Sequence, residues 1–583
     1  MGAKGKKRKR ARRPYPAKKA ARPGLSRKTA PHPQSGTGAV SGFLQERFFI
    51  ICLALIVLVG VFAYWNSFKV PFVFDDDPII AGNINLREFG TTITGTYHSR
   101  VVGFLTFALN YKINGLDVTG YHAFNLAIHL TSALLVFWLV TLTLKTPFLK
   151  QSRLSRPASV PLTVALFCAL IFVAHPVQTQ AVTYIVQRFA SLATMFYLLA
   201  VVMYAKWRLS AEDPKAAGLF GGRLTVDLPV KRGFFFAASL AATLLAMGTK
   251  ENAVTLPAVL ALWEFSFFGG AVKKRLAGLL PFALTLPVIP LVQVIGGMSL
   301  TSAPGVPGVT SPPPAIDYLL TQLRVIVTYI RLLFFPSGQN LDYDYPVYRS
   351  FLDPNVFMSF VFLLLVAGLG VFLWRHAKRE AGYAPLRLIA FGIFWFFITL
   401  SVESSFITIA DVIFEHRLYL PSAGLIIAVV VAAAMATESL QERVAWIARA
   451  AVPLAAAAVV ALSLATFSRN QAWADPITLW QDTVAKSPGK ARAHYNLGFY
   501  LQHSGQAAKA EAELRQAIEL NPEYVAALGS LGLLYMDSGQ FDRAEPLLLK
   551  AQTTDPDNTD ANYNLGLLYA SQSRFAPAID LYR

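Results

Sequence analysis

The chain has 583 residues, of which 54% are hydrophobic and only 15% are charged. This composition excludes an ordinary soluble globular protein and indicates a protein with several membrane-spanning segments. The net charge of +19 lies mostly at one end, because residues 1–47 hold seven lysines and seven arginines against one glutamate.

Residues 1–47 combine this charge with proline, glycine and serine, which predicts a disordered tail. We expect the tail to stay in the cytoplasm and to contact anionic lipid, since basic segments flanking membrane spans are retained there. Nucleic-acid binding is the alternative interpretation, and we expect no such partner. The first apolar run, Phe48 to Trp65, is long enough to cross a bilayer and lacks a cleavage site, so it predicts an uncleaved anchor.

Further apolar runs, separated by basic loops, extend the predicted transmembrane domain over residues 48–467. About eleven spans are predicted, at residues 48–65, 121–144, 159–174, 179–205, 233–249, 253–269, 276–299, 356–374, 386–402, 418–436 and 450–467. The apolar segment 316–335 is expected to lie flat or re-entrant on the outer face. Counting it as a span would place the basic residues Arg375, Lys378 and Arg379 outside.

With the tail inside, this order of spans places a set of polar motifs on one extracytoplasmic face. The set comprises Asp75, Asp76, Arg100, His175, Lys250, Glu251, Asp342, Asp344, Glu403, Glu415, His416 and Arg417. Charges with only structural roles would divide between the two faces, so this clustering predicts a functional site. We expect a multi-pass inner (plasma) membrane protein whose site faces the periplasm, or the lumen of the endoplasmic reticulum in a eukaryote.

Residues 489–583 change character and repeat every 34 residues. Asn496-Leu497-Gly498 recurs as Ser530-Leu531-Gly532 and as Asn564-Leu565-Gly566. This period is typical of tetratricopeptide helix pairs, which stack into a solenoid with a concave groove. Residues 468–488 are predicted to supply a connecting half-repeat. Because the chain ends at Arg583 within a helix, we expect a truncated sequence or an array that continues. The predicted fold class is all-α, a polytopic membrane bundle followed by a tetratricopeptide α-solenoid.

Three consecutive carboxylates, Asp75, Asp76 and Asp77, lie shortly after the first span. Acids this close to hydrocarbon are costly unless they carry out chemistry or cap a helix. Asp77 precedes Pro78, which predicts an N-cap with proline at the first helical position. Asp75 and Asp76 remain unexplained, and we predict that one of them is a general base, without separating them. A solvated turn is the alternative.

Six motifs, in matching order, resemble the membrane half of the transmembrane and tetratricopeptide-containing O-mannosyltransferases. They are Phe74-Asp75-Asp76, Leu105-Thr106-Phe107-Ala108-Leu109-Asn110-Tyr111, His122-Ala123-Phe124-Asn125-Leu126, His175-Pro176-Val177-Gln178-Thr179-Gln180-Ala181-Val182, Lys250-Glu251-Asn252 and Arg417-Leu418-Tyr419-Leu420-Pro421-Ser422. The resemblance runs from about residue 48 to the end of the chain.

The resemblance implies a GT-C fold and an inverting transfer of a mannose-like sugar. A hydroxyl, as in serine or threonine of a protein, would attack a polyprenyl-phosphate sugar, with an aspartate of the first outer loop as base. The lipid-linked donor is then a co-substrate, and we expect no cofactor and no metal. The other expected partners are the lipid bilayer and an acceptor polypeptide in the groove of the repeats. Transfer to a glycan or lipid, a secondary transporter and a non-catalytic membrane scaffold are the alternatives.

A phosphate leaving group needs positive charge, so we searched for cations near the predicted site. The candidate phosphate ligands are Arg188, Lys250, Arg324, Arg331 and Arg417, for which structural pairing or interfacial snorkelling is the alternative. Possible site-lining residues are Arg100, His175, Glu251, Tyr343, Glu415 and His416. His122 and His129 share a helix face, and without a third ligand they predict polar packing between helices rather than a metal site.

Overall fold

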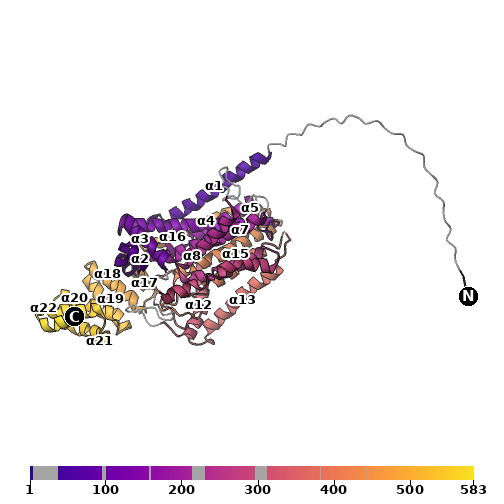
Figure 1. Cartoon of the computed structure of the whole chain (residues 1–583). Helices are drawn as coiled ribbons and strands as arrows, with labels where there is room; N and C mark the ends of the chain where they lie inside the picture. The colour runs from indigo at the N-terminus through magenta and orange to yellow at the C-terminus, as the bar shows by residue number, and fades with distance from the viewer. Residues whose placement is uncertain are drawn as a thin grey trace. The chain divides into compact units, whose positions relative to one another are not determined.

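The computed structural model describes residues 1–3, 37–94, 100–155, 159–212, 230–295, 312–380, 382–441 and 443–583. Within these ranges the regular structure is helical and contains no strand, which confirms the predicted all-α class (Figure 1). Residues Met1–Leu44 form one unit and Gln45–Arg583 a second. Most of the predicted tail, residues 4–36, lies outside the described residues, but α1 begins at Thr37, so the end of that predicted tail is helical.

The helices of the membrane part are α1 (Thr37–Tyr64), α2 (Phe89–Thr94), α3 (Val101–Asn114), α4 (Val118–Thr143), α5 (Ser159–Ala174), α6 (Thr179–Val182), α7 (Arg188–Glu212), α8 (Arg232–Met247), α9 (Leu256–Phe267), α10 (Val272–Ala283), α11 (Val288–Ile295), α12 (Ala315–Phe334), α13 (Pro354–His376), α14 (Leu386–Leu400), α15 (Tyr419–Gln441) and α16 (Ala445–Gln471). The C-terminal helices are α17 (Pro476–Lys486), α18 (Ala491–His503), α19 (Ala507–Leu520), α20 (Val525–Asp537), α21 (Phe541–Thr554), α22 (Thr559–Ser571) and α23 (Phe575–Tyr582).

Aspartate side chains fix the starts of several helices. Asp117, Asp353 and Asp475 each accept a hydrogen bond from a backbone N–H of the first turn, before α4, α13 and α17. Pro354 and Pro476 follow two of these caps at the first helical position. The chain thus begins these helices where a capping side chain satisfies an otherwise unpaired donor.

Seven helices in the described ranges are long and apolar enough to cross a membrane, and the bent pair α5 and α6 makes an eighth. The prediction of about eleven spans is therefore not met by helix length. The three remaining predicted spans correspond to α8, α9 and α14. At a rise of about 1.5 Å per residue, each of these helices is shorter than a hydrocarbon core of about 30 Å. Of the predicted span 276–299, residues 296–299 lie outside the described residues.

The α13 helix shows which surface of the bundle meets lipid. Met358 and Leu365 are 64% and 68% exposed, and Phe357, Leu364 and Phe372 are exposed beside them. Such a continuous apolar surface is unfavourable in water and suits acyl chains. Together with the long apolar helices, this surface identifies a multi-pass membrane protein.

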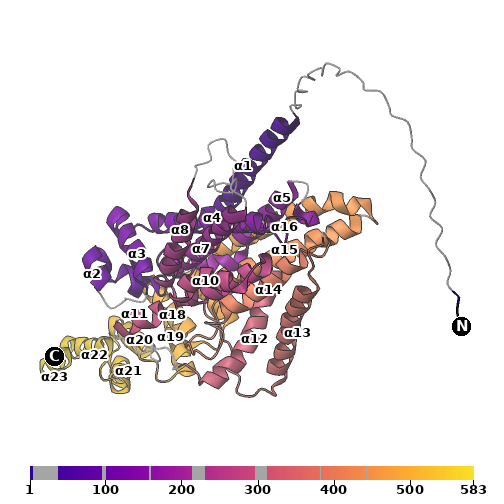
Figure 2. The ribbon, with the colours of Figure 1, turned by 45° about the vertical axis from the view of Figure 1, so that its right-hand side comes forward.

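The α12 helix lies beside α13 (Figure 2) but is not among the long apolar helices. Its inner face is polar. The Tyr318 hydroxyl donates to the carbonyl oxygen of Glu403 at 2.7 Å, and Gln322 donates to that of Val412 at 2.7 Å. The helix is therefore fastened to residues 403–412, and its flat position on the outer face stays a prediction.

The α14 and α15 helices touch at two glycines. A Cβ atom added at Gly424 would lie 2.6 Å from the carbonyl oxygen of Gly392 and 2.6 Å from Cδ1 of Trp395. Small residues of this kind allow membrane helices to approach closely.

Gly424→Ala should therefore lower the free energy of unfolding by about 1–3 kcal/mol, the usual effect of overpacking. Gly368→Ala on α13 is the matched control, because nothing lies within 4 Å of its Cβ position. Alanine also has the higher helix propensity. Thermal unfolding of the purified protein in detergent measures both variants, and equal midpoints would contradict the close packing.

The C-terminal helices form the predicted repeats. Helices α18, α20 and α22 start 34 residues apart, as do α19, α21 and α23. The glycine of each Leu-Gly pair allows the second helix to pack closely: a Cβ atom at Gly498 would lie 2.8 Å from Leu514, and one at Gly532 would lie 2.5 Å from Leu548. The helix α17 occupies the predicted half-repeat and packs against α18.

The predicted polar packing of two histidines is confirmed. His122 is hydrogen-bonded to the carbonyl oxygen of Val70 at 2.8 Å, which connects α4 to the loop after α1. His129 is hydrogen-bonded to the hydroxyl of Tyr419 at 2.7 Å, which connects α4 to α15. Cys52 and Cys168 are buried free thiols.

Candidate active site

The acid loop, residues 73–77, contains a strained residue next to its carboxylates. Phe74 has a φ of 54°, in the left-handed region that bulky side chains rarely adopt. Such strain persists where the surrounding packing fixes it. The Phe74 ring centroid lies 6.4 Å from that of Tyr184 and 5.5 Å from that of Trp480, and the guanidinium carbon of Arg492 lies 5.1 Å from it. This packing fixes the backbone that carries the acids.

Asp76 is completely buried and ties the acid loop to the segment before α7. Its Oδ1 accepts a hydrogen bond from the N–H of Val186 at 2.6 Å, and its Oδ2 accepts one from the N–H of Val73 at 3.1 Å. Burial raises the pKa of Asp76 well above its usual range, against the effect of these two hydrogen bonds. Both oxygens are occupied, which is typical of a supporting carboxylate.

The prediction that Asp77 caps a helix is wrong. Asp77 is the first residue of a single π-type turn, Asp77–Ala81, and Asp76 occupies the cap position without a capping side-chain bond. The Asp76 carboxylate cannot cap this turn because the N–H groups of Val73 and Val186 hold it. Asp77 itself is exposed and accepts a long hydrogen bond, 3.4 Å, from the Tyr500 hydroxyl.

Asp75 is half-buried, and its backbone N–H donates to the Tyr184 hydroxyl at 2.9 Å. Burial raises the pKa of Asp75, while the Tyr184 hydroxyl and the charge of Arg492 act in the opposite direction. Asp411 and Asp342 add to the rise. A partly accessible carboxylate with a raised pKa suits a general base. The structure therefore distinguishes two acids that the sequence leaves equivalent.

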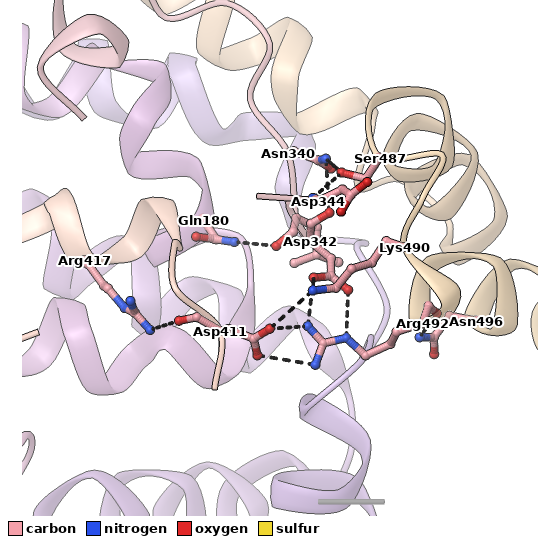
Figure 3. A network of polar contacts seen from close by, with 11 residues as sticks. Gln180, Asn340, Asp342, Asp344, Asp411, Arg417, Ser487, Lys490, Arg492 and Asn496 are labelled. Atoms are coloured by element: carbon pink, nitrogen blue, oxygen red, sulfur yellow. Dashed lines mark hydrogen bonds and ion pairs between the residues drawn. The ribbon is translucent and has the colours of Figure 1, made fainter. Parts of the chain in front are cut away.

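Arg492 of α18 is the centre of the ion-pair network drawn in Figure 3. The network lies next to the acid loop, because the Arg492 guanidinium also covers the ring of Phe74. Its Nε and Nη2 donate to the two carboxylate oxygens of Asp342 at 2.7 and 2.8 Å, and Nη2 also donates to Asp411 at 2.7 Å. Lys490 adds ion pairs with the same acids at 3.5 and 3.9 Å. Burial acts to lower the pKa of Arg492, but the two carboxylates raise it well above its usual value.

A second group of ion pairs connects Lys250 and Glu251 to two other segments, which carry Glu403 and Arg100. Lys250 and Glu403 form an ion pair of 2.6 Å, with side chains only 8% and 9% exposed. Arg100 donates to both oxygens of Glu251 at 3.0 and 2.9 Å. Burial acts to raise the pKa of Glu251, but Arg100 lowers it, and the net shift is downward. An acid thus already pairs with Lys250, one of the predicted phosphate ligands.

Arg417, in contrast, has no carboxylate partner within ion-pair distance in the part of the chain that the structure describes. Its Nη2 donates to the carbonyl oxygen of Asp411 at 2.7 Å and its Nη1 to that of Val412 at 3.2 Å. The neighbouring His416 is buried against Phe414, and its backbone N–H donates to Gln180 at 2.8 Å. Arg417 is therefore a buried cation held by neutral acceptors.

Three predicted site-lining residues make contacts that support the surrounding segments, and their role in lining the site stays a prediction. Glu415 accepts hydrogen bonds from the Tyr343 hydroxyl at 2.6 Å and from the N–H of Asn340 at 2.7 Å, which fixes the loop that carries Asp342. His175 accepts a hydrogen bond from the N–H of Val177 at 3.2 Å and lies 2.9 Å from the carbonyl oxygen of Leu333. It caps the turn after α5 and connects it to α12.

Arg188 does not fit its predicted role as a phosphate ligand. It is completely buried, and its guanidinium donates to Asn125 at 2.6 Å and to the carbonyl oxygens of Thr106 and Tyr121 at 3.2 and 3.1 Å. The guanidinium also lies over the ring of Phe107, 4.4 Å from the centroid. These contacts hold α3, α4 and α7 together, and a guanidinium that is completely buried among them is not accessible to an external anion.

The two predicted phosphate ligands on α12 are more accessible. Arg324 is half-buried, and within the described ranges no hydrogen bond or ion pair holds its side chain. Arg331 is exposed and donates to the carbonyl oxygen of Ser337 at 3.0 Å. Both guanidinium groups can therefore reach an anion.

Sequence reasoning did not identify Arg492, Asp411 or Tyr184. One signal was present: Arg492 occupies a repeat position that Ala526 and Asp560 fill in the next two periods. An arginine that interrupts the repeat pattern indicates a contact outside the repeats. Asp411 and Tyr184 lie in irregular segments and give no such signal.

No group of three or more His, Cys, Asp or Glu side chains in the described ranges is placed to hold a metal ion. Metal independence stays a prediction. A cavity of about 870 Å³ opens between α5, α15 and α16, lined by Phe167, Val430 and Ala433, with Arg153 and Glu438 also in its wall. No acid-loop residue lines it, and its walls come from these three helices and from residues 151–154, so it lies apart from the acids.

Comparisons with known proteins show what the chain is similar to. A family model described as tetratricopeptide repeat matches residues 501–561. The protein O-mannosyl-transferase TMTC3 of Homo sapiens is 24% identical over 521 residues, covering 82% of this chain and 52% of that protein. Tmtc3 of Drosophila melanogaster is 26% identical over 561 residues, covering 86% of this chain and 58% of that protein.

The chain is similar to the TMTC protein O-mannosyl-transferases over most of its length. The resemblance predicted from the motifs is thereby confirmed. The chain spans about half the length of the human relative. Among solved structures, ArnT from Cupriavidus metallidurans bound to undecaprenyl phosphate matches with a TM-score of 0.37 and 15% identity, covering 85% of this chain and 79% of that one.

Proposed function

We propose that the chain is a GT-C-type membrane glycosyltransferase that moves a mannose-like sugar from a polyprenyl phosphate to an acceptor hydroxyl. The names of its relatives support the reaction class. The observation that carries the assignment is the acid loop, in which a strained Phe74 and a fully bonded Asp76 hold Asp75 half-exposed. A secondary transporter is less well supported, because these acids lie in a loop between spans rather than at mid-membrane.

In the proposed reaction, the acceptor oxygen attacks the anomeric carbon of the sugar while Asp75 takes the hydroxyl proton. The bond between the anomeric carbon and the phosphate oxygen breaks, and the polyprenyl phosphate leaves with the bonding electrons. The configuration of the sugar inverts because there is one displacement. A positioned base contributes roughly 10²–10⁴-fold to such a rate.

Positive charge must meet the leaving phosphate as its negative charge develops. The accessible guanidinium groups of Arg324 and Arg331 support a role in this step. Arg417 is the next candidate, since only neutral oxygens accept its hydrogen bonds. The reaction as written needs no metal and no organic cofactor.

The site is proposed to face the extracytoplasmic side, with serine or threonine of a polypeptide as the acceptor. The repeats support a polypeptide, because stacked helix pairs present a concave groove to extended chains. Holding the polypeptide in the groove would raise its local concentration at Asp75.

The purified protein in lipid vesicles, given a panel of radiolabelled polyprenyl-phosphate sugars, tests this proposal. Serine- and threonine-containing peptides, glycans and lipids are offered as separate acceptors. Label from polyprenyl-phosphate mannose in the peptides is expected. Label in a glycan or lipid would show that the acceptor belongs to that class and is not a polypeptide. No transfer from any donor would favour a non-catalytic scaffold.

A further inference from the structure

The first repeat packs directly against the acid loop and shares an apolar core with it. Val73, Tyr184, Trp480 and Leu497 belong to one buried apolar cluster, which continues into the later repeats. The ring centroids of Tyr184 and Trp473 lie 5.6 Å apart. A shared core of this kind fixes α17 and α18 against the loop that carries Asp75.

Polar contacts fix the turn before α18 from the opposite side. The Ser487 hydroxyl accepts hydrogen bonds from Asn340 at 2.7 Å and from the N–H of Asp344 at 2.8 Å. A Cβ atom at Gly489 would collide with the carboxylate of Asp344, so the two segments are in direct contact. Arg492, which follows this turn, is therefore held in place independently of its own ion pairs.

Asp411 connects Arg492 to a candidate phosphate ligand. Its carboxylate accepts hydrogen bonds from Arg492, while its backbone carbonyl oxygen accepts one from Arg417 (Figure 3). Arg492 also covers the ring of Phe74, the residue before Asp75. One side chain from the repeats thus contacts Asp411, which accepts a hydrogen bond from Arg417, and Phe74, which precedes Asp75.

We propose that Arg492 is a positioning residue of the transferase site and that α18 is a working part of the catalytic domain. This inference rests on the proposed function. It differs from tethering, because a tether changes only the local concentration of a polypeptide acceptor. A positioning role affects transfer to any acceptor, including a single amino acid derivative.

The groups that face Asp75 predict a distinctive pH dependence for variants of Arg492. They are Arg492 from α18, Asp411 and Asp342 from two loops, together with the hydroxyl of Tyr184. Removing Arg492 takes away a nearby positive charge and leaves Asp342 and Asp411 with only the longer ion pairs to Lys490, and both changes raise the pKa of Asp75. A protonated Asp75 cannot accept a proton, so the variant should lose activity at low pH and recover it as the pH rises.

The test compares pH–rate profiles of full-length Arg492→Gln and Arg492→Lys in vesicles, with a short serine derivative as acceptor. Arg515→Gln is the matched control, since Arg515 is also an ion-paired arginine of the repeats but lies at their surface. We expect the acidic limb of Arg492→Gln to move to higher pH, with a loss of about tenfold for each unit of movement. Arg492→Lys should retain part of the effect, and Arg515→Gln should match the parent protein.

Hydrogen exchange of the same variants separates this inference from the proposed function. The N–H groups of Asp75 and Val186 donate to Tyr184 and Asp76, so their exchange reports the position of the acid loop without any substrate. Faster exchange of both in Arg492→Gln supports positioning even if no sugar is transferred. Unchanged exchange, or a loss of rate by the same factor at every pH, would overturn the inference.

Discussion

Asp75→Asn is expected to lower the rate of sugar transfer by about 10²–10⁴-fold, the contribution of a positioned general base. An amide has nearly the same shape as the carboxylate but cannot accept the proton of the acceptor hydroxyl. Because Asp75 is half-exposed and its backbone N–H, which donates to Tyr184, is unchanged by the substitution, the fold should tolerate the change. Initial rates with a labelled donor measure the loss, and thermal unfolding checks the fold.

Asp76→Asn should behave differently, because both Asp76 oxygens accept backbone N–H groups. The asparagine NH₂ group would face one of these donors, so the loop should loosen and the protein should become less stable. Asp542→Asn, an exposed aspartate of α21, is the matched control for both variants. Parental activity in Asp75→Asn, combined with loss in Asp76→Asn, would reverse the roles of the two acids.

The pH dependence of the parent protein follows from the same carboxylate. Burial raises the pKa of Asp75, so its basic form should be lost on acidification at a higher pH than an exposed aspartate, whose pKa is about 3.9. Activity should therefore fall below this raised pKa, and in Asp75→Asn the residual rate should lack that acidic limb.

Lys250→Met should lower the free energy of unfolding by about 3–5 kcal/mol, the usual effect of breaking a buried ion pair. The substitution leaves the Glu403 carboxylate, which lies 2.6 Å from Lys250 in the parent protein, without a cation. Replacing both residues, as Lys250→Met with Glu403→Gln, removes the buried charge and should restore most of the stability. Thermal unfolding without donor measures both variants.

The exposed pair of Arg349 and Asp317 provides the control. These side chains are 3.9 Å apart and Arg349 is 85% exposed, so Arg349→Met should change stability by only about 0–1 kcal/mol. If Lys250→Met were no more destabilised than Arg349→Met, the buried pair would not be a structural element of the site.

The sequence period and the positions of the charges predicted the repeats and the meeting of distant motifs. The 34-residue period fixed the repeats, because each Leu-Gly pair marks the same close contact between two helices, as Gly498 and Leu514 show. The one-sided placement of charges anticipated that distant motifs meet, and Arg100 with Glu251 and Lys250 with Glu403 do so. Their side of the membrane stays a prediction.

Other features depended on three-dimensional contacts that a local pattern does not contain. Arg188 looked unpaired because its partners are backbone carbonyl oxygens and Asn125 on other helices. Asp75 and Asp76 are neighbours in sequence, and they are distinguished by burial and by the N–H groups of Val73 and Val186, which bind Asp76. Hydropathy also does not reveal the length of a helix, so the apolar runs did not show that a predicted span such as α9 is a helix of only 12 residues.

The most direct test is the anomeric configuration of the product formed by the purified protein from a polyprenyl-phosphate mannose of known configuration. With Asp75 as a base there is one displacement, so NMR of the product should show the inverted linkage, and Asp75→Asn should form it about 10²–10⁴-fold more slowly. A retained linkage would require two displacements through a covalent sugar intermediate and would contradict the role assigned to Asp75.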